Sequence, residues 1–287
     1  MKRDVVSGRR SPTVRRRRLG IELRRLRDDA GLTIEQVADA LECSDSKISR
    51  IETGQVGATP RDVRDMLQLY GVANQRRDAL LQSAREARQR DWWQAYSDTL
   101  IVPLVGMEAA ASSIRIYETL LVHGLFQTRR YAGTVIRTVR PDLRPEEVER
   151  WVEFRMARQS LLARDTPPAL SAVLDEALLR RPVGGPAAMA EQLHHLARVA
   201  ALPTVTLQVL PFAAGHHAGM SGAFTIFSFP EPDGPDVVYL EHTKSDLYLE
   251  SEEEIRRYAA AFDQLRAMAL PPDDSIAFLV ALAGSLA

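Results

Sequence analysis

Five polar residues in one short segment have types and spacing suited to hydrogen bonding with another macromolecule. The segment reads DSKISRIE, and the residues are Asp45, Ser46, Lys47, Ser49 and Arg50. Ile48 and Ile51, three positions apart, would share the opposite side of a helix. A helix with such an outer face fits the major groove of DNA, where residues near its N-terminus reach base edges. The segment therefore suggests direct reading of bases.

Each of these side chains has its own expected role. Arg50 can donate two hydrogen bonds to one guanine, whereas Ser46 and Ser49 can bond to any base or to a phosphate. Lys47 is expected on a phosphate. Asp45 is expected to accept from a cytosine amine or to orient Arg50 or Lys47. Further candidates for DNA contact lie in neighbouring segments, and they are Thr33, Gln55 and Arg61. The alternative is that the polar residues form only a solvated helix face.

Short helices on either side are expected to position this segment. Apolar residues at i, i+4 and i+7 predict the first helix, and they are Leu19, Leu23 and Leu26. A capping box, Thr33 followed by Gln36, begins the second helix. Ser44 is placed to cap the third, and Thr59-Pro60-Arg61-Asp62 opens a fourth. Residues 19–90 are therefore predicted to form an all-α domain of about five helices, the last one a polar linker helix.

This stretch resembles the helix-turn-helix of the lambda repressor and Cro family, also called XRE-type regulators. The matching residues are Leu23-Arg24-Arg25-Leu26-Arg27, Ala30-Gly31-Leu32-Thr33, Val37-Ala38, Leu41, Ser46-Lys47-Ile48-Ser49-Arg50-Ile51-Glu52 and Gly54. The family often has a glutamine just after the cap of the second helix, where it contacts phosphate and braces the reading helix. This chain has Ile34 there. One such unit covers few base pairs, so we expect a homodimer that binds a two-fold operator.

Charge is spread unevenly along the chain. Lysine and arginine number 37 against 38 aspartate and glutamate, which gives a net charge of −1. Residues 1–18 nevertheless hold eight basic residues, including the run Arg15 to Arg18, against only Asp4. Such a basic arm can follow the phosphate backbone or enter a minor groove. The alternative for residues 1–18 is a disordered tail that aids solubility.

The rest of the chain, residues 91–287, predicts an α+β domain with a mostly antiparallel sheet. Its segments run from helices to strands and back to helices. Strands are expected over 113–122, 170–174, 204–210, 224–229, 237–242 and 246–250. Helices are expected over 107–112, 129–139, 145–162 and 187–201, and from Ser251 onward. Trp92 and Trp93 follow the linker helix and are expected to be buried at the domain junction.

Polar residues of this second domain offer weaker candidates for a ligand or partner site. His216 and His217 lie in a loop between glycines, and with Glu241 and His242 they could form a mixed metal site. A loop held by histidine hydrogen bonds is the preferred interpretation, and we expect no metal. Arg181 precedes a Val-Gly-Gly-Pro segment whose amides could bind an anion, although a simple turn explains it as well. No catalytic motif is complete, so an enzyme is not expected.

The second domain also resembles a known group, the large C-terminal domain of actinobacterial XRE-type regulators described as antitoxin-like. The motifs that carry the resemblance are His123 to Thr128, Val173 to Gly185, Gln208 to Phe212, Gly215-His216, Gly222-Ala223-Phe224, Val237 to Tyr239 and Tyr248 to Glu250. The group usually has proline at 123 and leucine at 126, where this chain has His123 and Phe126. The resemblance implies transcription control, often beside a gene for a small partner protein.

Several classes of protein are disfavoured by composition. The single cysteine, Cys43, excludes an internal disulfide framework and a multi-cysteine metal site. The charged N-terminus lacks the apolar segment of a signal peptide, and the C-terminal SIAFLVALAGSLA is too short to cross a bilayer. We therefore expect a cytoplasmic protein with no cofactor.

The sequence thus predicts a sequence-specific DNA-binding transcriptional regulator whose C-terminal domain senses a ligand or a small protein partner. One alternative is an antitoxin-like protein that sequesters a small partner and controls its own operon. A second alternative is an enzyme of unknown reaction tethered to DNA.

Overall fold

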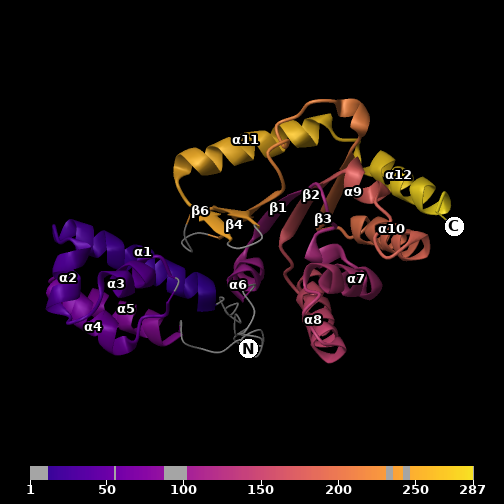
Figure 1. The fold of residues 1–287 in the computed structure, drawn as a ribbon. Coiled ribbons are helices and arrows are strands. Elements are labelled where there is room, and N and C mark those ends of the chain that lie inside the picture. Colours follow the sequence, from indigo (N-terminus) through magenta and orange to yellow (C-terminus); the bar gives the residue numbers. More distant parts are fainter. Residues whose placement is uncertain (1–11, 55, 87–101, 231–234, 242–245, 287) are drawn as a thin grey trace, which may run out of the picture. The chain divides into compact units, whose positions relative to one another are not determined.

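The computed structural model describes residues 12–54, 56–86, 102–230, 235–241 and 246–286 (Figure 1). The chain divides into two compact units, of which the first ends at Ala110 and the second begins at Ala111. The domain boundary predicted between residues 90 and 91 lies outside the described residues, as do Trp92 and Trp93.

The first unit is helical, as predicted. Its helices are α1 (Pro12–Asp29), α2 (Ile34–Ala40), α3 (Asp45–Glu52), α4 (Pro60–Leu69), α5 (Asn74–Glu86) and α6 (Val102–Ala110). Thr33, Ser44 and Thr59 each accept a hydrogen bond from the backbone amide three residues further on. These bonds satisfy amides that have no partner inside the helix, which is why α2, α3 and α4 begin where the sequence predicts.

The core of this unit contains all the residues predicted to face inward, which are Leu19, Leu23, Leu26, Ile48 and Ile51. Its other buried residues include Val37, Ala38, Val63, Leu67 and Tyr70. Leu41 packs against them and is only partly buried. Gly20 lets α1 approach α3 closely, because a Cβ there would lie 2.5 Å from the carbonyl oxygens of Ile51 and Glu52. A larger residue at position 20 would push the two helices apart.

Helix α1 starts earlier than the sequence suggested. Residues 12–18, predicted as part of a basic arm, form its first turns, whereas residues 1–11 lie outside the described part of the chain. The loop after α3 packs directly on these turns: a Cβ at Gly54 would lie 2.7 Å from the Arg17 Cα. This packing gives the turns a tertiary partner, which charge composition does not reveal.

The second unit is built on one six-stranded sheet with the order β3-β2-β1-β4-β5-β6. Its strands are β1 (Ser113–Glu118), β2 (Ala169–Asp175), β3 (Val205–Leu210), β4 (Phe224–Ser228), β5 (Val237–Leu240) and β6 (Leu247–Leu249). β1, β2 and β3 are parallel neighbours, whereas the β1–β4, β4–β5 and β5–β6 pairs are antiparallel. The predicted α+β fold is confirmed. The sheet is mixed, with three antiparallel and two parallel strand pairs among the described residues.

Helices connect the parallel strands and cover both faces of the sheet. After β1 come η2 (Gly124–Phe126), α7 (Arg129–Val139), α8 (Pro145–Arg158) and η3 (Gln159–Ala163), and after β2 come α9 (Glu176–Arg180) and α10 (Pro186–Ala200). Parallel neighbours require such crossovers, which explains why this half of the sheet alternates with helices. The chain then passes through η4 (Phe212–Ala214) and returns to place β4 beside β1.

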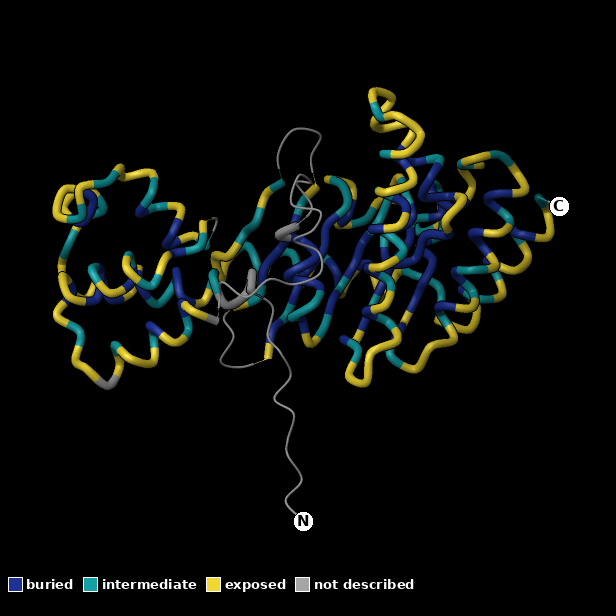
Figure 2. The backbone as a smooth tube through the Cα atoms, turned by 90° about the horizontal axis from the view of Figure 1, so that it is seen from below, coloured by how far each residue is buried: buried dark blue, intermediate teal, exposed yellow. Residues whose placement is uncertain are grey.

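Two further helices, α11 (Glu252–Met268) and α12 (Pro272–Gly284), end the unit. Phe262 and Leu265 of α11 pack on the sheet face that carries Tyr117 and Phe224, while α7, α8 and α10 lie on the other side (Figure 1). α12 packs against α10 and β3. The strands between these layers are largely dark blue in Figure 2, in keeping with their buried side chains.

Among the described residues, no single helix has both the length and the apolar composition of a membrane span. Only α11 and α12 taken together reach both, with a bend of 68° between them.

Candidate nucleic-acid interface

Helix α3 is amphipathic in the predicted way. Ile48 and Ile51 are buried, whereas Asp45, Ser46 and Arg50 are exposed. Lys47 and Ser49 are partly exposed. The five side chains proposed to face DNA are therefore all open to solvent on the outer part of the helix.

Arg50 lies along the outside of α3. Its Nε donates a hydrogen bond to the Ser46 carbonyl oxygen at 3.0 Å, one turn earlier. Within the described residues, its two terminal amino groups make no hydrogen bond. Because a guanine offers two adjacent acceptors, these two groups suffice for a paired contact with one base.

Asp45 occupies the first turn of α3, where the helix dipole favours a carboxylate. Among the described residues it forms no ion pair, so in the protein without DNA it orients neither Arg50 nor Lys47. Its predicted orientation of one of these cations on DNA stays a prediction. Lys47 turns to a different carboxylate and Arg50 to a helix carbonyl oxygen. The other predicted role for Asp45, acceptance from a cytosine amine, stays a prediction.

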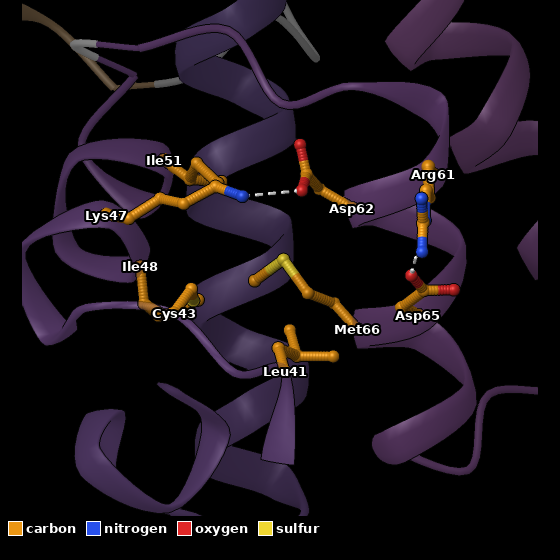
Figure 3. A pocket seen from close by; sticks show the side chains of 9 residues that line it. All are labelled: Leu41, Cys43, Lys47, Ile48, Ile51, Arg61, Asp62, Asp65 and Met66. Atoms are coloured by element: carbon orange, nitrogen blue, oxygen red, sulfur yellow. Dashed lines mark hydrogen bonds and ion pairs between the residues drawn. The ribbon is translucent and has the colours of Figure 1, made fainter. Parts of the chain in front are cut away.

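Lys47 joins α3 to the start of α4. Its Nζ lies 2.8 Å from Asp62 Oδ1, and this hydrogen bond raises the pKa of Lys47 (Figure 3). Burial opposes ionisation of Asp62, but bonds from Lys47 and Thr59 outweigh it and lower its pKa. The ammonium charge that was expected on a phosphate is therefore largely balanced within the protein.

Arg61 lies next to Asp62 in the first turn of α4. Its Nε lies 3.8 Å from Asp65 Oδ2, and its side chain is 87% exposed. Asp62 and Asp65 line a cavity of about 240 Å³ beside α3, together with Lys47, Cys43 and Met66 (Figure 3). Arg61 lines it as well, so two basic and two acidic side chains balance each other in the wall of this cavity.

Thr33 and Gln55 are the remaining predicted contacts with DNA. Thr33 is exposed, but its hydroxyl accepts the Gln36 amide at 3.2 Å and its own amide donates to Gln36 Oε1 at 2.9 Å. Both groups take part in the capping box, and the hydroxyl keeps its own O–H as a donor. Gln55 lies outside the described residues.

A buried ion pair, which the sequence analysis missed, holds the helix-turn-helix together. Arg27 on α1 donates from Nε and Nη2 to the two carboxylate oxygens of Glu52, at 2.7 and 3.0 Å. Its Nη1 also donates to the Leu32 carbonyl oxygen at 2.8 Å. Burial and the nearby charge of Glu52 raise the pKa of Tyr70, a buried residue of the same core. In the sequence, this ion pair is visible only as an arginine and a glutamate on the sides of their helices that face the core.

The second unit does not bring its predicted ligand residues together. His217 lies with Asp175 at the end of β2, with Nε2 3.8 Å from Oδ2. Glu241 follows β5, which is separated from β2 by β1 and β4. His216, Glu241 and Arg181 are exposed, and His242 lies outside the described residues. The preferred interpretation, a loop held by histidine hydrogen bonds, fits His217, whose Nδ1 accepts from the Gly219 amide at 3.2 Å.

A buried polar network holds the loop from His123 to Thr128. Gln192 of α10 donates to the Phe126 carbonyl oxygen and accepts from the Thr128 amide, both at 2.7 Å. His123 Nδ1 accepts from the Leu125 amide at 3.3 Å. Burial, with nearby Arg158 and Arg155, lowers the pKa of His123 to about 3. The imidazole is therefore neutral at ordinary pH.

Comparison with known proteins assigns families to both parts of the chain. A family model described as a helix-turn-helix domain matches residues 18–80, and another, described as a domain of unknown function (DUF5753), matches residues 102–280. No curated protein and no solved structure matches. The first match confirms the predicted helix-turn-helix and indicates a DNA-binding regulator.

Proposed function

Since the chain belongs to the DUF5753 family of domains of unknown function and carries a helix-turn-helix domain before it, we propose that it is a sequence-specific transcriptional regulator. In this proposal α3 enters the major groove of an operator. The second unit receives the signal that changes DNA binding.

The outer face of α3 is the observation that carries this proposal. Ser46 and Arg50 are exposed on it, and Arg50 keeps two amino groups for a base. The buried Ile48 and Ile51 fix the opposite side of the helix against the core. Because the helix cannot rotate without exposing these residues, its polar side chains are presented in one fixed orientation.

We propose that the regulator acts as a homodimer. α3 has eight residues, and a helix of that length contacts only a few successive base pairs. Two copies related by a two-fold axis would read two half-sites about 34 Å apart, which is one turn of DNA. A signal received by the second unit would act by favouring one spacing of the two copies of α3.

The source of that signal is either a small molecule or a small partner protein, as the sequence analysis predicted. The second unit provides a sheet whose three parallel strands end at a common edge. Ligands of α/β domains bind at such edges. This arrangement supports a small molecule, and no catalytic step is needed.

The test is selection of DNA sequences from a random library by the intact protein. We expect a two-fold symmetric motif. The Arg50→Ala variant should bind the selected operator about 5- to 150-fold more weakly, as expected for loss of one paired base contact, and should tolerate any base at one position of each half-site.

Arg24→Ala is the matched control, because it removes the same charge from an exposed position on α1, 65% exposed in its side chain. It should keep both the affinity and the motif. Selection of no common motif, or an unchanged motif with Arg50→Ala, would refute the assignment of α3.

A further inference from the structure

Three polar side chains meet at the carboxyl edge of the parallel strands in the second unit. Tyr117 is the fifth residue of β1, Asp175 is the last residue of β2, and His217 lies in the loop after β3. β1 and β2 are hydrogen-bonded neighbours, so their ends are adjacent. The Tyr117 and His217 rings are in edge contact, with their centroids 6.0 Å apart.

Tyr117 has a polar group in an unusual position. Its side chain is fully buried, yet its hydroxyl finds no hydrogen-bond partner among the described residues. Burial raises the pKa of this hydroxyl, and so do the charge of Asp175 and a weak hydrogen-bonding interaction with its carboxylate, which lies outside ordinary hydrogen-bond geometry. A buried hydroxyl without a partner costs free energy, so its retention at this edge points to an external partner.

The geometry of His217 determines which hydrogen bonds an external partner must make. Its Nδ1 accepts from the Gly219 amide at 3.2 Å, so the neutral ring carries its proton on Nε2. Nε2 lies 3.8 Å from Asp175 Oδ2, which is too long for a direct hydrogen bond. Asp175 Oδ1 is already used, because it accepts the Ala177 amide at 2.8 Å at the start of α9. Oδ2 therefore remains available as an acceptor, and the Nε2 donor of His217 lies too far away to reach it directly.

A single oxygen atom between Nε2 and Oδ2 can bond to both. The atom must accept from His217 and donate to Asp175. A carboxylate or a fully ionised phosphate group cannot donate, and an ammonium cannot accept, whereas a hydroxyl does both. We propose that this edge is a binding site for a small uncharged hydroxylated molecule, a polyol or a sugar, held by Tyr117, Asp175 and His217.

The loop of residues 215–222 covers the site. Its backbone lies directly on the Tyr117 ring, since a Cβ at Gly219 would come 2.2 Å from Cε1. Gly215 and Gly222 have φ values of +68° and +123°, which suit glycine and bound the loop at both ends. Met220 in this loop is 73% exposed. Binding of a molecule larger than one hydroxyl group moves this loop, which gives the site a means of signalling.

The regulatory role of this site rests on the proposed function, but its ligand chemistry does not. The intact protein is therefore titrated with glycerol and, separately, with D-glucose, and the ring nitrogens of its six histidines are followed by NMR. The His217 signals are identified by their loss in His217→Gln. We expect a saturable shift at His217 with at least one of the two probes.

Two variants keep the fold and remove one hydrogen bond each. Tyr117→Phe deletes only the hydroxyl, and Asp175→Asn retains an oxygen to cap α9. Each should weaken binding of the probe by about tenfold or more. His216→Gln, an exposed neighbour, should leave it unchanged.

Absence of a saturable shift with both probes, or equal binding by Tyr117→Phe and the unmodified protein, would overturn the proposed site. Operator binding by Tyr117→Phe is measured in parallel without either probe and should be unchanged. Failure of the ligand site would then leave the regulator proposal standing, whereas failure of the operator selection would leave the NMR result intact.

Discussion

Replacing Arg27 with alanine tests how the first unit holds α1 against α3. Arg27 and Glu52 are 7% and 4% exposed, and their two hydrogen bonds measure 2.7 and 3.0 Å. The substitution leaves the Glu52 carboxylate buried with neither bond. It also removes the donor to the Leu32 carbonyl oxygen, which lies between α1 and α2.

The expected cost follows from this burial. Breaking a buried ion pair by removing one partner costs about 3–5 kcal/mol, because the remaining charge is left uncompensated. At about 1.4 kcal/mol for each factor of ten, the equilibrium for opening of the first unit should rise by about two to four orders of magnitude. The Arg27→Met, Glu52→Met double variant should recover much of this loss, since it leaves no buried charge.

Hydrogen exchange of the intact protein, followed by mass spectrometry, measures both effects. Peptides from α1 and α3 report on the first unit, and peptides from β1 and β2 provide an internal reference. Exchange in the first set should accelerate in Arg27→Ala, while the second set is unchanged.

Arg24→Ala is the control on the same helix. Arg24 lies 4.0 Å from Asp28 and its side chain is 65% exposed, so its loss should cost less than about 0.5 kcal/mol. The reasoning is refuted if Arg27→Ala exchanges as slowly as the unmodified protein, or if Arg24→Ala causes an equal acceleration.

Three other substitutions test the remaining contacts. Asp62→Asn removes the carboxylate that holds Lys47, so that Lys47 can bind a DNA phosphate. The slope of log affinity for DNA against log salt concentration should then steepen by about 0.9. An unchanged slope would show that Lys47 does not contact the DNA backbone. Folding lowers the pKa of His123 from 6.5 to about 3. Between these two pH values the unfolded chain binds a proton at His123 and the folded protein does not. The folded state therefore loses stability as the pH falls from 6.5 toward 3. Urea unfolding at pH 7 and pH 5 should show this loss, up to about 1.4 kcal/mol per pH unit, and His123→Asn, which can still accept the Leu125 amide, should lack it. Gln192→Leu leaves two buried backbone groups of the 123–128 loop without partners, which should cost about 2–4 kcal/mol and accelerate exchange in that loop; slow exchange there would mean that the network is dispensable.

The local structure of the helix-turn-helix could be predicted because its signals lie within a few residues of each other. Thr33, Ser44 and Thr59 each cap a helix through an amide three positions away. Ile48 and Ile51 turn inward because helical periodicity places them on one side. The same local reasoning gave α7, α10 and five of the six strands to within two residues of their observed bounds, whereas the first strand, predicted over 113–122, ends at Glu118.

Partners far apart in the sequence could not be predicted in this way. Lys47 was expected on a phosphate, but α4 brings Asp62 to it from 15 positions away. His217 was grouped with Glu241 as possible ligands of a mixed metal site, yet the placement of β4 beside β1 puts two strands between β2 and β5.

The sequence by itself therefore determined where α2, α3, α4 and the strands begin, which sides of these elements are apolar, and that α3 presents a polar face. Only the tertiary structure decided which charged side chains of α3 are not paired within the protein. It also decided which residues meet at the carboxyl edge of the parallel strands. The physical reason is that caps and periodicity act between near neighbours in the chain. The Arg27–Glu52 pair and the edge formed by Tyr117, Asp175 and His217 depend instead on how whole elements pack.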